Sequence, residues 1–170
     1  AFERSLAIHG GSPEALNNLA LCHIQLGEYD AARRVLERAQ RSDPEDYGTW
    51  LNLGVVELEQ RNFAAARALF EKCLERRPAD AELHFDFGHL EQSQGNAGAA
   101  EERYLRALEL QPEYAEAWSN LGQVHLGARR LPEALAAFER VVALTPDDAV
   151  AHFNLGIARR AQGDEAGARA

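Results

Sequence analysis

The chain has 170 residues, 46% of them apolar or aromatic, which is enough for one domain or one continuous array and argues against disorder. Its formal net charge is −9 and Lys72 is its only lysine, so binding to nucleic acid through the phosphate backbone is not expected. The apolar runs fall far short of the roughly 20 residues that a membrane-spanning helix needs, and no secretory leader is visible. A cytoplasmic protein without a membrane partner is therefore expected.

A repeat of 34 residues runs through the sequence. Asn-Leu-Gly occurs at residues 52–54, 120–122 and 154–156, and the same shift carries Pro44 onto three further prolines. The shift also relates a set of small residues and a set of large ones: Ala32, Ala66, Ala100, Ala134 and Ala168, and Leu36, Phe70, Tyr104 and Phe138. A fixed period of this length predicts one structural unit repeated along the chain.

Each unit is predicted to be an antiparallel pair of helices, because apolar residues at helical spacing lie on both sides of a short break. The breaks fall near residues 25–27, 61–62, 95–96, 128–129 and 163. In chain order we expect the second helix of a preceding unit at 1–12, four complete units at 13–46, 47–80, 81–114 and 115–148, and a partial unit at 149–170 with a first helix and the start of a second.

The glycine in the middle of the first helix costs about 1 kcal/mol relative to alanine, so a packing reason is expected for it. We expect Gly54 and its equivalents to mark places where two helices approach closely, with Phe70 and its equivalents filling the adjoining space. Cys22 and Cys73 lack disulfide or zinc spacing, and both thiols are expected to be buried.

The pattern resembles the tetratricopeptide repeat (TPR) family over essentially the whole chain. The residues that match its signature in one unit are Trp50, Leu53, Gly54, Ala66, Phe70 and Pro78, and they recur as Trp118, Leu121, Gly122, Ala134, Phe138 and Pro146. The resemblance implies an all-α fold, an α-α superhelix whose first helices line a concave groove for peptides or partner proteins. Two positions depart from the family: His23, Glu57, Glu91, His125 and Arg159 replace an aromatic residue, and His84 and His152 replace the tryptophan.

A column of polar residues follows the period along the first helices: Asn18, Asn52, Asp86, Asn120 and Asn154. An amide is both donor and acceptor, so a row of amides can hold the backbone of an extended peptide, whereas Asp86 can only accept. Asparagine ladders also occur in the TPR arrays of O-GlcNAc transferases, which residues 118–122 resemble in their amino-acid sequence. The alternative is that these are solvent-facing polar residues inherited through duplication.

The residues around the column are expected to complete a peptide-binding groove that is polar to acidic, with apolar patches. They are Asn17, Leu51, Phe85, His89, Ser119, Gln123 and Phe153. Only Arg160 offers the positive charge with which co-chaperone members of the family hold acidic tails. A neutral or basic partner segment therefore suits the groove better than an acidic one.

No catalytic, metal or cofactor site is expected, because four of the six histidines occupy packing positions, His89 faces the groove without a metal-ligand partner at a suitable spacing, and no phosphate loop is present. The leading hypothesis is a non-catalytic scaffold for proteins or peptides. A second is the substrate-recruiting region of a larger enzyme, for example a glycosyltransferase similar to the O-GlcNAc transferases. A third is self-association through uncapped ends, where Phe2 and Leu6 present apolar surface.

Overall fold

The computed structural model describes residues 12–168, with side chains for residues 12–163. Within this range the secondary structure is entirely α-helical. Residues 1–78 and 79–170 form two compact units, unit 1 and unit 2, and each is considered by itself. The helix expected for residues 1–12, with Phe2 and Leu6, lies outside the described residues apart from Ser12.

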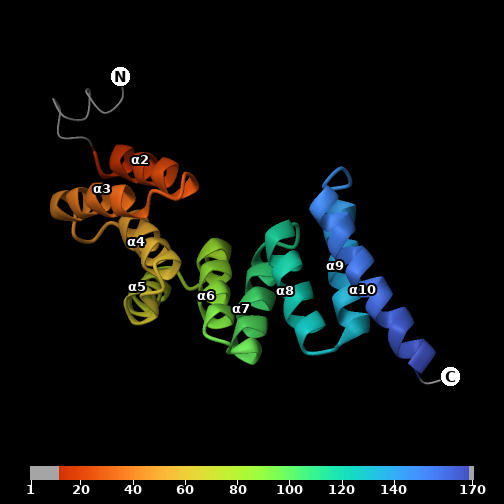
Figure 1. The fold of residues 1–170 in the computed structure, drawn as a ribbon. Helices are drawn as coiled ribbons and strands as arrows, with labels where there is room; N and C mark the ends of the chain where they lie inside the picture. Colours follow the sequence, from red (N-terminus) through yellow and green to blue (C-terminus); the bar gives the residue numbers. More distant parts are fainter. Residues whose placement is uncertain (1–11, 169–170) are drawn as a thin grey trace. The chain divides into compact units, whose positions relative to one another are not determined.

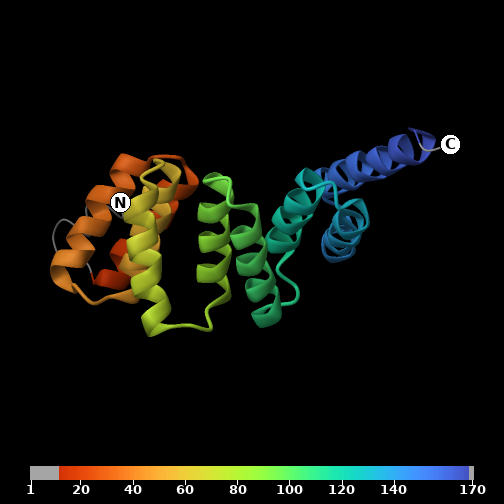
Figure 2. The same cartoon turned by 90° about the horizontal axis from the view of Figure 1, so that it is seen from below.

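The helices come in pairs, and the two members of each complete pair lie side by side in both views (Figure 1, Figure 2). Unit 1 holds α2 (Pro13–Gln25), α3 (Tyr29–Ser42), α4 (Tyr47–Glu59) and α5 (Phe63–Arg76). Unit 2 holds α6 (Ala81–Ser93), α7 (Ala97–Leu110), α8 (Ala115–Gly127), α9 (Leu131–Leu144) and α10 (Ala149–Ala168). We call α2, α4, α6, α8 and α10 the first helices and the others the second helices. The first helices begin 34 residues apart.

Four first helices begin at a residue whose side chain accepts a hydrogen bond from a backbone N–H of the first turn. Ser12 caps α2, Asp46 caps α4 through the N–H of Thr49 at 2.7 Å, Asp80 caps α6, and Asp148 accepts from the N–H of Val150 in α10. Such caps satisfy N–H groups that have no partner within the helix, and each contributes about 1 kcal/mol. The repeat therefore fixes the start of the helices as well as their length.

The turn inside each complete pair uses one residue in the left-handed region. The φ angles are 72° at Gly27, 61° at Arg61, 80° at Gly95 and 57° at Arg129. Arg61 and Arg129 adopt a conformation that costs a side-chain-bearing residue roughly 1–2 kcal/mol. The turn expected at Gly163 is not found, because α10 continues to Ala168. Too few described residues follow Gly163 for a second helix that would pack back on α10 and hold such a turn.

Three glycines of the first helices, Gly54, Gly88 and Gly122, lie against an aromatic ring of the second helix, as the sequence predicts, whereas nothing lies within 4 Å of a Cβ built at the equivalent Gly156. A Cβ built at Gly88 would lie 2.6 Å from Cε1 of Tyr104, and one at Gly122 would lie 2.7 Å from Cε1 of Phe138. Gly54 meets Phe70 in the same way. The close approach explains why the helix interior tolerates glycine, since any larger residue would push a fully buried ring out of place.

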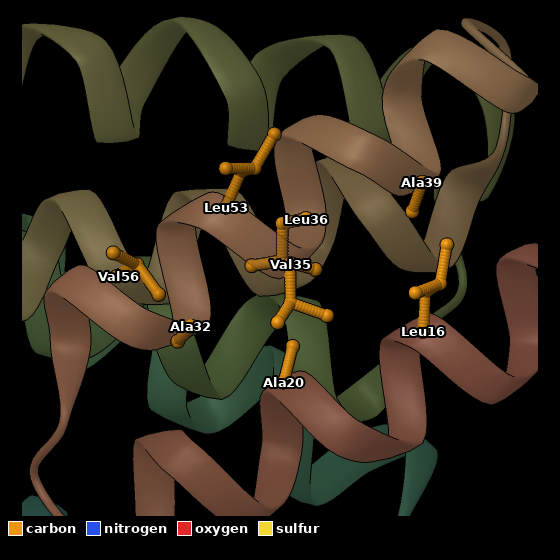
Figure 3. Packing of buried hydrophobic residues seen from close by; sticks show 8 residues of the cluster. All are labelled: Leu16, Ala20, Ala32, Val35, Leu36, Ala39, Leu53 and Val56. Atoms are coloured by element: carbon orange, nitrogen blue, oxygen red, sulfur yellow. The ribbon is translucent and has the colours of Figure 1, made fainter. Parts of the chain in front are cut away.

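The apolar core of unit 1 joins three helices (Figure 3). Its buried residues come from α2 (Leu16, Ala20), α3 (Ala32, Val35, Leu36, Ala39) and α4 (Leu53, Val56). Because α4 packs on α3 as well as on α5, each helix pair shares its core with the next pair of the same unit. Unit 2 repeats the arrangement with a cluster from α7 and α8 and another from α9 and α10.

The prediction that both thiols are buried is wrong for Cys22, which is exposed, whereas Cys73 is fully buried. The equivalent positions in later first helices, Val56 and Leu90, are buried. Val56 reaches this state by packing against the second helix of the preceding pair. In residues 12–168, no helix combines the length and the apolar character needed to cross a membrane.

Candidate functional site

All the residues predicted to bind a peptide lie on the first helices. In unit 1 they are Asn17 and Asn18 on α2 and Leu51 and Asn52 on α4. In unit 2 they are Phe85, Asp86 and His89 on α6, Ser119, Asn120 and Gln123 on α8, and Phe153 and Asn154 on α10. Within each unit, neighbouring first helices also contact one another, α2 with α4 and α6 with α8.

In unit 1, Asn17 is part of a closed hydrogen-bond network at the start of α4. Its Nδ2 donates to Oδ2 of Asp46 at 2.7 Å, and its Oδ1 accepts from Oγ1 of Thr49 at 3.1 Å. Burial alone would raise the pKa of Asp46, but the hydrogen bonds from Thr49 and Asn17 and the charge of Arg77 outweigh it and lower the pKa. Asn17 thus joins two helix pairs and is only 9% exposed.

The other predicted residues of unit 1 differ from one another in exposure. Asn18 is exposed, whereas Leu51 is 7% and Asn52 is 8% exposed. The Asn52 amide makes no hydrogen bond with any residue of the described range. Because its amide has no partner among the described residues, this largely buried side chain can offer both a donor and an acceptor to another molecule.

In unit 2, Tyr104 of α7 connects three of the predicted residues. Its hydroxyl donates to Oε1 of Gln92 at 2.6 Å and accepts from Nδ2 of Asn120 at 3.3 Å. The ring centroid of Phe85 lies 5.9 Å from that of Tyr104. Burial raises the pKa of the Tyr104 hydroxyl, as does the charge of Asp86, while the hydrogen bond from Asn120 lowers it. Phe85, Asp86 and Asn120 therefore share one buried neighbour.

Tyr114, the residue before α8, adds a second aromatic ring to the same place. Its centroid lies 4.9 Å from that of Phe85, with 35° between the ring planes. Burial raises the pKa of Tyr114, and four carboxylates raise it further: Asp86, Glu82, Glu116 and Asp80. The starts of α6 and α8 thus carry two aromatic rings that lie near several carboxylates.

The remaining predicted residues of unit 2 stand apart from this group. His89, Ser119 and Asn154 are half-buried, and Gln123 is exposed. Phe153 is 67% exposed, and on the same helix Val150 is 63% exposed. Large exposed apolar side chains of this kind mark a surface that another element can cover.

Charge is divided between the two kinds of helix. The helices α2, α4, α6 and α8 contain no lysine or arginine, whereas α3 alone carries four arginines. Among the first helices with described side chains, α10 is the exception, with Arg159 and Arg160. The predicted face is therefore acidic on α6 and α8, in line with the charge expected from the sequence.

Two residues of the site were not predicted from the sequence, although each carries a signal. Tyr104 was assigned only to the ring position of Phe70, but a buried tyrosine also needs a partner for its hydroxyl. Tyr114 occupies the repeat position that Asp46, Asp80 and Asp148 hold before α4, α6 and α10. A ring in place of a capping aspartate is a departure from the period that points to a local change of contacts.

Several residues at the two positions that depart from the family make polar contacts, either with nearby residues or with the neighbouring helix. Nε2 of His152 bonds the carbonyl of Pro146 at 2.8 Å, as the indole of Trp50 does with Pro44 at 2.9 Å. Glu57 is buried and accepts from Nδ2 of Asn62 at 2.9 Å. No group of three His, Cys, Asp or Glu side chains able to hold a metal ion occurs among the described residues.

The chain belongs to the tetratricopeptide repeat family. The model of that family matches residues 1–47, 18–81, 85–149 and 125–170. Among solved structures, a thermophilic TPR protein of Thermus thermophilus is 26% identical and has a TM-score of 0.80, over 92% of this chain and 86% of that one. The fold class is therefore an all-α helical repeat of the superhelix type.

Two further proteins are similar to this chain. YrrB, a TPR protein with an unusual peptide-binding site, is 22% identical with a TM-score of 0.66, over 96% of this chain and 84% of that one. A segment of the rhomboid protease GluP of Bacillus subtilis (strain 168) is 42% identical over 48 residues, 28% of this chain. This chain spans only about a tenth of the length of that relative. The resemblance to O-GlcNAc transferases is limited to the short sequence of residues 118–122.

Proposed function

We propose that this chain is a non-catalytic scaffold that holds an extended segment of a partner protein on the faces of its first helices. The family and the solved relatives support a protein-interaction scaffold. The observation that carries the finer proposal is the asparagine column, in which Asn52 and Asn120 have amide atoms that no other described residue bonds. Asn52 makes no hydrogen bond in the described range, and Asn120 uses only its Nδ2.

The column supports this function because a peptide backbone alternates donors and acceptors along an extended chain. A primary amide matches both, so Asn18, Asn52 and Asn154 can each bond an N–H or a C=O of the partner. Contacts of this kind bind backbone and select little among side chains. Asn17 does not belong to the proposed contact set, because Asp46 and Thr49 occupy its amide.

The charge of the face supports a neutral or basic partner over an acidic one. The absence of lysine and arginine from α2, α4, α6 and α8 leaves an acidic segment without attraction there. Opposite potentials favour encounter and like potentials oppose it, so a basic segment would also associate faster at low salt.

The double variant Asn52→Ala with Asn120→Ala tests this proposal. A neutral hydrogen bond contributes about 1 kcal/mol, so losing two should weaken partner binding by about tenfold or more. Partners captured by the wild-type chain are identified by mass spectrometry, and their affinities are then measured by calorimetry. The matched control is Ser42→Ala with Gln111→Ala, two exposed polar residues at the ends of second helices. Equal affinity for every partner in the double variant and the control would end the proposal.

A second candidate is recruitment of substrates for a larger enzyme that contains these repeats. The matching stretch in a rhomboid protease favours it, because that relative combines a similar segment with an enzyme. The gene that encodes the whole protein decides between the two. A catalytic domain in the same reading frame would support recruitment, and a product consisting of repeats alone would exclude it.

A further inference from the structure

The aromatic pair of unit 2 lies among acceptors of hydrogen bonds. The rings of Phe85 and Tyr114, 4.9 Å apart, are both half-buried, so part of each remains open to another molecule. The hydroxyl of Tyr104 gives its only proton to Gln92, and it must therefore receive one from Nδ2 of Asn120. This bond fixes the amide of Asn120 with its Oδ1 available as an acceptor.

Carboxylates of α6, of α8 and of the residue before α6 lie near this pair. Asp86, Glu82, Glu116 and Asp80 act together on Tyr114, and burial and Asp80 raise the pKa of Glu82. Neither α6 nor α8 contains a lysine or arginine that would neutralise these carboxylates. This part of the surface thus combines aromatic rings, carboxylates and one amide oxygen, and α6 and α8 contribute no lysine or arginine to it.

We propose that Phe85, Tyr114, Asp86 and Asn120 form a binding site for an arginine side chain of the partner segment. The inference rests on the proposed function, because it names the chemistry of a partner held on the same face. The guanidinium stacks on the rings, donates to the carboxylate of Asp86 and to Oδ1 of Asn120, and places its charge near Glu82 and Glu116.

Arginine fits this arrangement better than lysine for two reasons. Its planar group stacks on aromatic rings and carries five N–H donors in fixed directions, which suits acceptors on two different helices. Its weaker hydration also lowers the cost of entering a half-buried place between rings. Lysine offers a compact charge that would satisfy Asp86 without needing the rings. An acidic side chain would meet four like charges.

The test uses the full 170-residue chain labelled with ¹⁵N and three short peptides. The peptides are acetyl-Gly-Ser-Arg-Ser-Gly-amide and its versions with lysine or citrulline in the centre, citrulline being the neutral counterpart of arginine. We expect the arginine peptide to shift the amide signals of α6 and α8, including the side-chain NH₂ of Asn120. Charge-assisted hydrogen bonds and a cation–ring contact should make the lysine and citrulline peptides at least about fivefold weaker.

Three variants test which residues bind the peptide. Asp86→Asn should weaken the arginine peptide by about tenfold, because an amide has no charge to pair with the guanidinium. Phe85→Leu should weaken it several fold by removing the ring. Glu102→Gln, which removes one exposed carboxylate from α7, is the control for net charge and should leave the affinity unchanged. Circular dichroism checks that each variant is folded, and Glu82→Gln replaces Asp86→Asn if that variant is not.

The inference is overturned if no peptide shifts these signals, if lysine binds as tightly as arginine, or if Glu102→Gln weakens binding as much as Asp86→Asn. The outcome is separable from that of the proposed function. Loss of the natural partner in the Asn52 and Asn120 double variant, with full retention in Asp86→Asn, supports the scaffold and rejects the arginine site. If the arginine peptide binds as expected and natural partners bind the double variant as tightly as the wild-type chain, the arginine site is retained and the asparagine column is rejected.

Discussion

Asn17 and Asp46 in unit 1 occupy the same repeat positions as Phe85 and Tyr114 in unit 2, two periods further along the chain. In unit 1 the pair is a hydrogen bond of 2.7 Å that also holds Thr49. In unit 2 it is a contact of two rings, 4.9 Å apart. The contact between one helix pair and the next is kept, while its chemistry changes from polar to aromatic.

The difference affects what each unit can offer a partner. In unit 1 the polar groups of Asn17, Asp46 and Thr49 satisfy one another, so this part of the face is already occupied. In unit 2 no aspartate side chain caps α8, and the ring of Tyr114 at its start lies near the carboxylates of Asp86, Glu82, Glu116 and Asp80. A repeat with constant geometry can therefore carry a structural contact in one unit and a candidate binding site in another.

The comparison presupposes that both units share the same packing of a ring on a glycine, and Phe70→Ala removes that packing from unit 1. Phe70 is fully buried against Gly54, so we expect the free energy of unfolding to fall by about 3–5 kcal/mol. Urea denaturation followed by circular dichroism measures it. Ala68→Gly on the same helix, at an exposed position, should cost about 1 kcal/mol. Equal losses in the two variants would contradict the packing role.

The polar contact of unit 1 is the next most costly to remove. Asp46→Ala deletes the cap of α4 and leaves Nδ2 of Asn17 and the backbone N–H of Thr49 without their acceptor, and we expect a loss of about 2–3 kcal/mol. The same urea experiment measures it. Asp148→Ala is the matched control, because Asp148 is an exposed aspartate at the equivalent position before α10. A loss no larger than that of the control would show that the network does not stabilise unit 1.

The period in the sequence predicts the fold because the repeated residues are those that set the backbone. Gly88 and Tyr104, or Gly122 and Phe138, meet as expected from their spacing alone. The spacing does not reveal which polar residues pair between helices, since Asn17 and Asp46 are distant in sequence and asparagine at that position occurs only once. Period-based reasoning treats every unit alike and therefore assigned Asn17 to the groove.

The candidate site is less predictable than the fold for the same reason. The asparagine column is visible in the sequence because it follows the period, and its peptide-binding role remains a prediction. Tyr104 and Tyr114 gain their importance from being exceptions to the period, and an exception acquires meaning only from its neighbours in space. The exposure of Cys22 likewise depends on which helix covers α2, and no local pattern in α2 reports this.

The aromatic contact of unit 2 can be weighed with a double-variant cycle. Phe85→Leu, Tyr114→Leu and the double variant should show a coupling of about 0.5–1.5 kcal/mol, the usual range for a ring pair beyond its buried area. Urea unfolding of the four proteins gives this value. The pair Phe85→Leu and Phe63→Leu, from different units, serves as the control and should show no coupling. A coupling near zero for Phe85 and Tyr114 would mean that the rings merely lie near each other.

The smallest effect distinguishes the two contacts by acid. The pKa of Asp46 is lowered in the folded chain, so its contribution to stability is complete above its ordinary value of 3.8 and is lost as the pH falls through the folded value. Tyr114 at the equivalent position has no group that titrates in this range. We therefore expect the amide proton of Thr49, which donates to Asp46, to titrate in NMR spectra with a midpoint below pH 3.8. In Asp46→Asn this titration should vanish and the loss of stability in acid should become smaller.

Glu101→Gln removes a carboxylate of unit 2 whose pKa is lowered by its hydrogen bond with Arg130, and it should leave the Thr49 titration unchanged. If the midpoint of the Thr49 titration in the wild-type chain lay at or above pH 3.8, the hydrogen bonds of Asn17 and Thr49 would not be holding the carboxylate in its charged form, and the contrast between the two units would lose its electrostatic basis.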